Sequence, residues 1–386
     1  MRLLIAAGGT GGHIYPALAV ARSLRARPDA AELAWVGGHR GLEAGLVPGA
    51  GIAFHRLVLR SLRSVGLDGH AVLDPLRLGA SVPQAAAILA RFRPAAVFTT
   101  GGYVAIPVLL AAAPLGIPVV LWEGNVIPGR SVRATARLAD VLAVSFEATC
   151  DTLRSAAPDQ PCYVTGTPIR DLTAIEPGEA RARLKIAADE RVLLIFGGSQ
   201  AVRRFNGAVA AALGRLVERV VVIHVTGEDG YAAALADREG LPEASRDRYR
   251  PYPFLREDML AALASADLVI GRAGSSTLAE VTALGVPMIV VPYPHAAGHQ
   301  KANARTLVDA GAARLIDDGD FDAAALLGAA ALIDDPVAYP AMSAAARSLA
   351  RPGAADAVAD LVVAAAKRAT LPGALDIDRR SRGSVA

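Results

Sequence analysis

Residues 1–24, MRLLIAAGGTGGHIYPALAVARSL, place a short apolar strand directly before a cluster of glycines, and a stretch with helical spacing follows. Glycine after a strand lets the backbone turn sharply and lets a ligand approach the backbone amides, while the next helix presents unpaired N–H groups. The same order of arginine, apolar strand, glycine pair and hydroxyl returns at residues 191–200, RVLLIFGGSQ. A chain with two such loops is predicted to contain two similar halves.

Short apolar runs alternate with alanine-rich stretches of helical spacing along both halves, which is typical of βαβ units with a parallel sheet covered on both faces. In the first half, strands are expected at 3–6, 33–36, 96–99, 119–121 and 141–144, and helices at 16–25 and 82–91. In the second half, strands are expected at 192–196, 220–225, 268–270, 288–291 and 313–316, and helices at 203–217, 276–284, 299–310 and 354–367.

Turn residues cluster at residues 165–184, where we expect the linker between the halves. The predicted fold is α/β, with two doubly wound, Rossmann-like parallel-sheet domains that face a deep cleft and bind ligands beyond the carboxyl ends of their strands. The expected parts are an amino-terminal domain at 1–166, a carboxy-terminal domain at 167–350, a terminal helix at 351–370 that returns to the amino-terminal domain, and a loose tail at 371–386.

Composition limits the classes of protein. With 386 residues, 53% of them hydrophobic and 20% charged, the chain has material for two globular cores. The sequence pI of about 9.0 is a mild basic bias that fits an anionic ligand, a membrane surface or nucleic acid. No nucleic-acid-binding module is recognisable, so we expect no such partner. Cys150 and Cys162 give neither a disulfide framework nor a metal-binding spacing, which suits a reducing cytoplasm.

Neither a targeting signal nor a membrane span is expected. The first strand begins at Leu3, which leaves no room for a basic region, an apolar stretch and a cleavage site. The most apolar segment, residues 104–120, carries Pro107, Pro114 and Pro118. It is therefore predicted to form a buried helix, a turn and a strand.

The glycine loops suit phosphate or another oxyanion. The first loop lacks the Gly-Lys-Ser/Thr ending of an ATPase P-loop, and it lacks the GxGxxG spacing and the following acid of a dinucleotide-binding fold. Tight turns without a ligand are the alternative for a single glycine pair. Two further glycine turns, TTGGYVAIP at 99–107 and GRAGSSTLAE at 271–280, weaken that alternative.

The hydroxyls of Ser275, Ser276 and Thr277 can cap the helix that follows the last of these turns, and they can also donate to a diphosphate. Glu280, one turn later, can accept from ribose hydroxyls or be an ordinary solvated or capping carboxylate.

Five motifs occur in the order and spacing of one bacterial family: GGTGGHIYPALAVA from Gly8, TGGYVAIP from Thr100, GTPIR from Gly166, FGGSQ from Phe196, and RAGSSTLAE from Arg272 with HQKANA from His299. Over roughly residues 1 to 365 the chain resembles the MurG family, the peptidoglycan N-acetylglucosaminyltransferases. The resemblance implies a GT-B fold and inverting transfer of N-acetylglucosamine from UDP-N-acetylglucosamine to the 4-hydroxyl of the muramoyl sugar of lipid I, giving lipid II. It also implies a peripheral place on the cytoplasmic face of the cell membrane.

The resemblance also implies roles for individual residues. The residues expected at the donor sugar and its phosphates are Thr10, Gly11, Gly12, Asn125, Arg170, Ser199, His299 and Gln300. Leu255 matches the position that holds the uracil edge through backbone groups. The run of Ser275, Ser276, Thr277, Leu278, Ala279 and Glu280 matches the diphosphate and ribose site. No metal or other cofactor is expected, because helix termini, hydroxyls and Arg170 can stabilise the departing diphosphate.

The reaction requires the acceptor hydroxyl to lose a proton as it attacks the anomeric carbon, while the departing UDP needs hydrogen-bond donors. His13 is the candidate base, since a histidine can take a proton near neutral pH. The alternative is that His13 only hydrogen-bonds the loop or the sugar. Glu123 is the second catalytic candidate.

One segment departs from the family. Where the family usually has His-Glu-Gln-Asn, this chain has Trp122, Glu123, Gly124 and Asn125, so a histidine and an amide expected to line the cleft are missing. Two alternatives to the lipid I reaction therefore stay open: a transferase with the same donor and another acceptor, and a binder of nucleotide sugars without activity.

A basic, partly apolar surface is expected on the amino-terminal domain. Its members are Arg56, Arg60, Arg63, Arg77, Arg91 and Arg93 with Leu57, Leu59, Leu62, Leu76 and Leu78. Such a surface would attract anionic lipid head groups, although an ordinary solvated face has the same composition. Other cell-wall synthesis proteins are further candidate partners. His295 and His299 are four residues apart but lack the glutamate of a HExxH motif, so no metal site is expected there.

Overall fold

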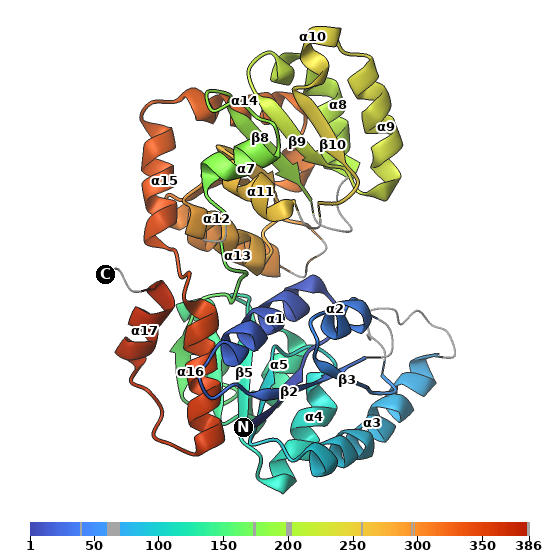
Figure 1. Ribbon diagram of the computed structural model, residues 1–386, viewed down its shortest axis with the longest axis vertical. Helices are drawn as coiled ribbons and strands as arrows, with labels where there is room; N and C mark the ends of the chain where they lie inside the picture. Colours follow the sequence, from blue (N-terminus) through green and yellow to red (C-terminus); the bar gives the residue numbers. More distant parts are fainter. Residues whose placement is uncertain are drawn as a thin grey trace. The chain divides into compact units, whose positions relative to one another are not determined.

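The computed structural model describes residues 1–38, 41–59, 70–172, 175–197, 203–255, 258–294, 296 and 298–383. The chain divides into two compact units, Met1–Arg170 with Arg351–Ala386, and Asp171–Ala350 (Figure 1). Each unit contains one parallel sheet with helices packed against it. The prediction of two Rossmann-like α/β domains is confirmed.

The first unit has a seven-stranded parallel sheet of order β3-β2-β1-β4-β5-β6-β7. The strands are β1 (Arg2–Ala6), β2 (Glu32–Gly37), β3 (Ala53–Arg56), β4 (Ala96–Thr99), β5 (Val119–Glu123), β6 (Val141–Val144) and β7 (Cys162–Val164). The helices are α1 (Gly11–Arg25), α2 (Glu43–Gly49), α3 (His70–Phe92), α4 (Ala105–Ala112), α5 (Arg130–Thr135), α6 (Glu147–Arg154), α16 (Ala354–Lys367) and α17 (Ala374–Arg382). The strand order reverses direction between β1 and β4, which is where sheets of this kind bind ligands.

The second unit has a six-stranded parallel sheet of order β10-β9-β8-β11-β12-β13. Its strands are β8 (Val192–Phe196), β9 (Val221–Val225), β10 (Tyr249–Tyr252), β11 (Leu268–Gly271), β12 (Met288–Val290) and β13 (Ala313–Leu315). Its helices are α7 (Pro177–Arg183), α8 (Arg203–Val217), α9 (Glu228–Glu239), α10 (Glu243–Arg246), α11 (Met259–Ser265), α12 (Ser275–Leu284), α13 (His299–Asp309), α14 (Ala323–Ala330) and α15 (Ala338–Ser348). Here the order reverses between β8 and β11, so each unit has its own reversal of strand order.

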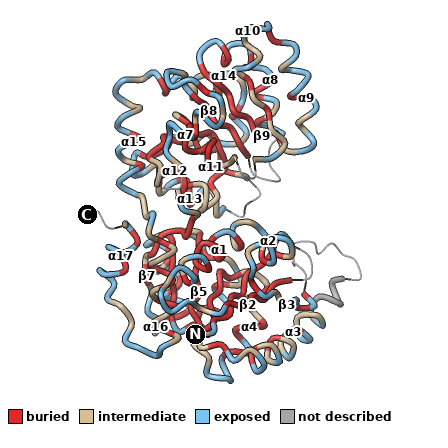
Figure 2. The backbone as a smooth tube through the Cα atoms, viewed as in Figure 1, coloured by how far each residue is buried: buried red, intermediate tan, exposed pale blue. Residues whose placement is uncertain are grey.

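Helices on both faces bury the central strands completely. Figure 2 shows these strands as buried and the outward sides of the helices as exposed. Every residue of β4, β5, β8 and β11 is buried, because these strands have neighbours in the sheet and helices above and below. Residues 104–120 form α4, a 3₁₀ turn (Ala113–Leu115) and the start of β5, as predicted. Among the described helices, none is both long and apolar enough to cross a bilayer.

The chain returns to the first unit after Ala350 and ends in two helices. Helix α16 packs on α1, and α17 packs on α16 and β7. The expectation of a loose tail from residue 371 is wrong over α17. Ile377 is buried, the N–H of Gly353 donates to the Ser381 carbonyl over 2.9 Å, and Arg351 pairs with Asp378 over 2.7 Å. The buried Ile377 and ion pairs to neighbouring segments, which include Arg380 with Asp356 over 3.1 Å, hold this mostly polar helix.

The expectation of two reduced cysteines is also wrong. Cys150 in α6 and Cys162 in β7 form a disulfide, with Cα atoms 5.9 Å apart. Helix α6 leads from β6 to β7, and β7 pairs with β6, so the fold brings together two cysteines that are 12 residues apart in sequence. Sequence spacing alone gives no such proximity.

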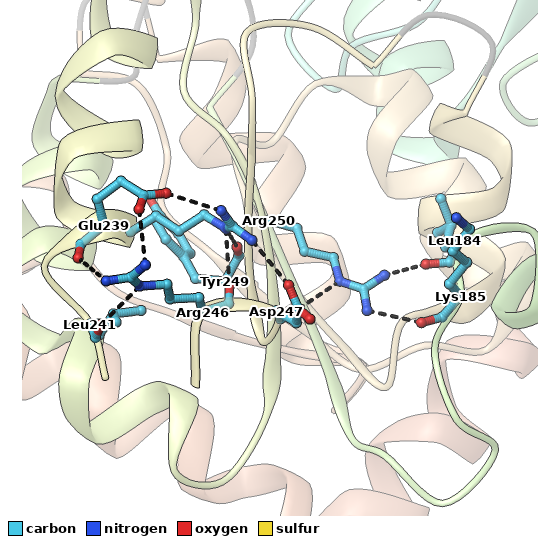
Figure 3. A network of polar contacts seen from close by, with 9 residues as sticks. Leu184, Lys185, Glu239, Leu241, Arg246, Asp247, Tyr249 and Arg250 are labelled. Atoms are coloured by element: carbon cyan, nitrogen blue, oxygen red, sulfur yellow. Dashed lines mark hydrogen bonds and ion pairs between the residues drawn. The ribbon is translucent and has the colours of Figure 1, made fainter. Parts of the chain in front are cut away.

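Arginines at the edge of the second sheet have structural partners (Figure 3). The guanidinium of Arg250 donates to the carbonyl oxygens of Leu184 and Lys185, and Arg246 donates to the carbonyl of Leu241 over 3.1 Å. The Arg250 contacts fix edge strand β10 to the turn after α7, and the Arg246 contact ties the end of α10 to the turn after α9. Part of the arginine excess therefore stabilises the fold and is not a sign of an anionic ligand.

Candidate functional site

His13 lies in the first turn of α1, where the glycine loop after β1 ends. Its Nδ1 atom is 2.8 Å from the carbonyl oxygen of Thr100, in the loop after β4. A carbonyl only accepts hydrogen bonds, so Nδ1 carries the proton and Nε2 of the neutral ring is left as an acceptor. The hydroxyl of Thr100 donates to the carbonyl of His13 over 3.1 Å. These two bonds orient a candidate base where the strand order of the first sheet reverses.

Gly102 lies beside the His13 ring in a backbone conformation that favours glycine. Gly102 has a φ of 77°, and a Cβ atom there would lie 3.5 Å from His13 Nε2. Thr10 and Gly12 are exposed at the start of α1, and Gly11 is partly exposed. No side chain in the described residues caps this helix. Its first N–H groups can therefore meet an anion.

Glu123, the second catalytic candidate, accepts hydrogen bonds from its own loop. The side chain is 3% exposed, and Oε1 accepts from both the backbone and the side-chain nitrogen of Asn125 over 2.9 Å. Oε2 accepts from the N–H of Gly129 over 2.8 Å. The hydroxyl of Thr149 in α6 donates to the Asn125 carbonyl over 3.0 Å. This geometry favours a role in orienting Asn125 over proton transfer by Glu123.

Trp122 does not line a ligand site in the first unit. Its side chain is 1% exposed and packs in a core cluster with residues of α1 and α16. The indole N–H donates to the carbonyl of Gly166 over 3.1 Å. Gly124 is buried as well. The interpretation that Trp122 replaces a residue facing the cleft is therefore wrong, since side chains alternate along β5 and this one points into the core.

In the second unit, the residues predicted to bind the diphosphate lie at the start of α12. Gly271 ends β11 where a Cβ atom would lie 3.0 Å from the Phe196 carbonyl, so the β11–α12 turn passes close to the end of β8. Gly274 is the N-cap, and no side chain among the described residues caps the helix. The hydroxyl of Ser276 is buried without a hydrogen-bond partner in the described structure. An uncapped helix start with a buried donor is suited to an anionic oxygen.

The other residues of this run have mixed surroundings. Ser275 and Glu280 are buried, and Thr277 and Ala279 are partly exposed. Leu278 packs in the core, so only its backbone is available to a ligand. Leu255, after β10, is partly buried against the same core.

Helix α13 supplies the last predicted residues. His299 and Gln300 are partly exposed at its start. Gln300 Oε1 accepts from the N–H of Tyr293 over 2.9 Å, which ties α13 to the loop after β12. Ser199 and His295 lie outside the described residues. Within the described ranges, no three histidine, cysteine, aspartate or glutamate side chains gather as a metal site requires.

Sequence reasoning missed Arg272, which stands directly before the Gly274 turn. It is 7% exposed, donates to the Val291 carbonyl over 3.0 Å and pairs with Asp318 over 2.6 Å. Its guanidinium also lies 4.7 Å from the ring centre of Phe205. Arg272 thus ties together the loops after β11 and β12. The sequence feature that could have indicated this role is an arginine placed directly after an apolar strand.

The expected basic surface is smaller than its sequence suggested. Leu57 and Leu59 belong to the core, whereas Leu76 is 66% exposed and Val58 is 50% exposed. Leu78 is partly buried, Arg77 is partly exposed, and Arg56, Arg91 and Arg93 are exposed. Arg60, Leu62 and Arg63 lie outside the described residues.

Both units match domains of a known protein family. The glycosyltransferase family 28 N-terminal domain matches residues 3–144, and the family 28 C-terminal domain matches residues 192–360. The chain is thus a two-domain family 28 glycosyltransferase.

Individual relatives identify the family within the family 28 glycosyltransferases to which the chain belongs. The UDP-N-acetylglucosamine–N-acetylmuramyl-(pentapeptide) pyrophosphoryl-undecaprenol N-acetylglucosamine transferase of Desulforudis audaxviator is 40% identical over 96% of this chain and 100% of its own length. The transferase of the same name from Desulforamulus reducens is 38% identical over 85% of this chain and 89% of its own length. The crystal structure of Acinetobacter baumannii MurG, 29% identical, superposes with a TM-score of 0.73 and covers 94% of this chain and 99% of that chain. The chain belongs to the MurG family, and the resemblance drawn from its motifs is confirmed.

Proposed function

We propose that this chain is an inverting glycosyltransferase that moves N-acetylglucosamine from UDP-N-acetylglucosamine to the 4-hydroxyl of the muramoyl sugar of lipid I, giving lipid II for peptidoglycan. Membership of the MurG family supports this reaction. The observation that carries it is the bond from His13 Nδ1 to the Thr100 carbonyl, because it places the proton on Nδ1 and makes Nε2 the basic nitrogen of the neutral ring. An oriented base distinguishes a transferase from a scaffold that only binds the donor.

The proposed chemistry is a single displacement at the anomeric carbon. The acceptor oxygen attacks that carbon, its proton passes to His13 Nε2, and the bond from the anomeric carbon to the diphosphate oxygen breaks as UDP departs. Attack from the face opposite the leaving group inverts the configuration. The first turn of α12, with Ser275, Ser276 and Thr277, meets the negative charge that develops on UDP.

The remaining assignments follow the family. The first unit is proposed to bind the acceptor and to face the membrane, and the second unit is proposed to bind the nucleotide. We assign the uracil to the backbone at Leu255 and the ribose to Glu280, with Leu278 and Ala279 adding only backbone contacts. The diphosphate and donor sugar are assigned to Thr10, Gly11, Gly12, Asn125, Arg170, Ser199, His299 and Gln300.

A peripheral position on the cytoplasmic face of the membrane fits the first unit. Exposed Leu76 and Val58, with the cation of Arg56 on the same unit, supply apolar and basic groups for an anionic bilayer surface. Binding to vesicles that contain an anionic lipid, but not to vesicles of neutral lipid alone, is the expected result.

A transfer assay tests the proposed reaction. Purified protein is incubated with radiolabelled UDP-N-acetylglucosamine and a short-chain lipid I analogue, and UDP release and labelled lipid are followed together. Equal amounts of the two products are expected. Donor binding without labelled lipid would contradict the reaction and would favour another acceptor.

A further inference from the structure

Glu43 is a buried carboxylate that the mechanism above does not use. It begins α2, directly after the loop that follows β2, and its side chain is completely buried. Oε2 accepts from the N–H of Gly9 over 3.2 Å, and Oε1 accepts from the N–H of Gly38 over 3.1 Å. One carboxylate therefore joins the glycine loop after β1 to the loop after β2.

Three glycines make room for this carboxylate. A Cβ atom at Gly8 would lie 2.6 Å from Glu43 Oε1, and one at Gly37 would lie 2.8 Å from Glu43 Cγ. A Cβ atom at Gly41 would overlap Oε2. Any side chain at these positions would displace the carboxylate, so the glycines of two loops together form its binding site.

Tyr103, from the loop after β4, completes the surroundings. A Cβ atom at Gly9 would lie 3.1 Å from the Tyr103 ring, and the phenol hydroxyl is buried without a partner in the described structure. Burial and the nearby charge of Glu43 raise the pKa of Tyr103 to about 12, so the phenol stays neutral. In such a dry setting, charge-assisted hydrogen bonds hold their partners firmly.

We propose that Glu43 is a positioning residue for sugar transfer. By holding the amide of Gly9, it fixes the loop that leads to His13 and thereby the place of His13 Nε2. This inference rests on the proposed function, because Glu43 acts through the base. A misplacement of reacting groups by about 1 Å can slow an enzyme about 100-fold, so a small loop shift is enough to matter.

The first test replaces Glu43→Gln. The amide of glutamine has only one acceptor oxygen, so its NH₂ group must face one of the two glycine N–H groups. We expect kcat to fall at least about 10-fold relative to the wild type. The KM for UDP-N-acetylglucosamine and the stoichiometry of UDP binding should stay within about twofold of the wild-type values. A kcat equal to that of the wild type would overturn the proposal.

Asp140→Asn is the matched control. Like Glu43, Asp140 accepts a backbone hydrogen bond through its carboxylate, here from the N–H of Val119 over 2.8 Å. This bond lies at the amino end of β5, away from the loops at the carboxyl ends of the strands. This variant should lose some thermal stability and keep its kcat. An equal loss of kcat in both variants would indicate a general effect of weakening the first unit and would overturn the proposal.

A double-mutant cycle with His13→Ala separates positioning from stability. If Glu43 acts through His13, Glu43→Gln should slow the His13→Ala enzyme less than about twofold further. If Glu43→Gln lowers kcat by the same factor in the wild type and in His13→Ala, Glu43 acts independently of His13. A His13→Ala enzyme with the wild-type kcat would show the same. Either result overturns the proposal.

If Glu43→Gln does not fold, Glu43→Asp takes its place in the cycle. It keeps the charge, and we expect a smaller loss of kcat that again disappears in the His13→Ala background. A wild-type chain without transfer would contradict the proposed function itself. An active wild type with unaffected Glu43 variants would contradict this inference alone.

Discussion

At the scale of single residues, the Ser276 hydroxyl is unfavourable for folding and is proposed to bind the diphosphate. This hydroxyl is buried at the start of α12 and has no hydrogen-bond partner among the residues that the structure describes. We predict that Ser276→Ala leaves the free energy of unfolding unchanged or raises it by up to about 1 kcal/mol, because an unsatisfied buried hydroxyl costs free energy. The affinity for UDP should fall about 10-fold, since the diphosphate loses a donor.

Thermal denaturation and calorimetric titration with UDP measure these two effects on the same samples. A less stable variant with unchanged UDP affinity would contradict the assignment of Ser276 to the diphosphate.

His224 in β9 links the stability of the second unit to pH. It is 1% exposed, and its Nδ1 lies 2.9 Å from the hydroxyl of Tyr249. Burial lowers the pKa of His224 from 6.5 to about 3, so between these values the unfolded chain binds a proton that the folded chain does not. Stability should be full above the unfolded pKa and fall as the pH drops, by about 2 kcal/mol at about pH 5.

The variant His224→Gln lacks this titrating group. Hydrogen exchange of the β9 amides at about pH 7.5 and about pH 5 should show a smaller loss of stability in the variant than in the wild type. The same pH dependence in both proteins would contradict a neutral, buried His224.

At the residue scale, the sequence could point only to groups that lie close together along the chain. The glycine loop and its histidine were visible because they are contiguous in residues 8–13. The roles of Glu43 and Arg272 were not, since their partners lie on loops that only the folded sheet brings together. Trp122 was misjudged for a related reason. Which face of β5 it occupies depends on the packing of α16, which lies far along the chain.

At the scale of elements, the disulfide joins α6 to β7 and closes a short loop in the first unit. Replacing Cys150→Ser together with Cys162→Ser should lower the free energy of unfolding by about 3 kcal/mol, because the unfolded chain regains the freedom of that loop. Both tryptophans, Trp35 and Trp122, lie in this unit, so their fluorescence reports its unfolding.

Wild-type protein treated with dithiothreitol should unfold as early as the double variant. A wild-type melting curve that does not respond to dithiothreitol would contradict the disulfide.

The sequence predicted buried strands well and edge strands poorly. The runs 96–99, 141–144 and 192–196 match β4, β6 and β8 to the residue, because central strands of a parallel sheet are continuously apolar. Strands β3, β7 and β10 were missed. All three are sheet edges: β3 and β10 contain polar residues, and β7 is only three residues long. Strand β10 also contains Pro251, which an edge strand tolerates.

At the scale of the whole molecule, the chain repeats one plan twice. Each unit reverses its strand order next to its first strand, and each places an uncapped helix start beside that position, α1 in the first unit and α12 in the second. The repeat was predictable from the two glycine loops. The division after Arg170 and the return of α17 to the first unit depend on contacts between segments distant in sequence.

The central claim is that His13, oriented by Thr100, accepts the acceptor's proton. The most direct measurement is kcat for the wild type, His13→Ala and His13→Gln, with UDP affinity measured alongside. Glutamine can still donate to the Thr100 carbonyl but cannot take a proton at neutral pH. We predict that both variants lose a factor of about 100 to 10,000 in kcat with little change in UDP affinity. A His13→Gln enzyme close to the wild-type rate would show that the residue only holds the loop, and would contradict the claim.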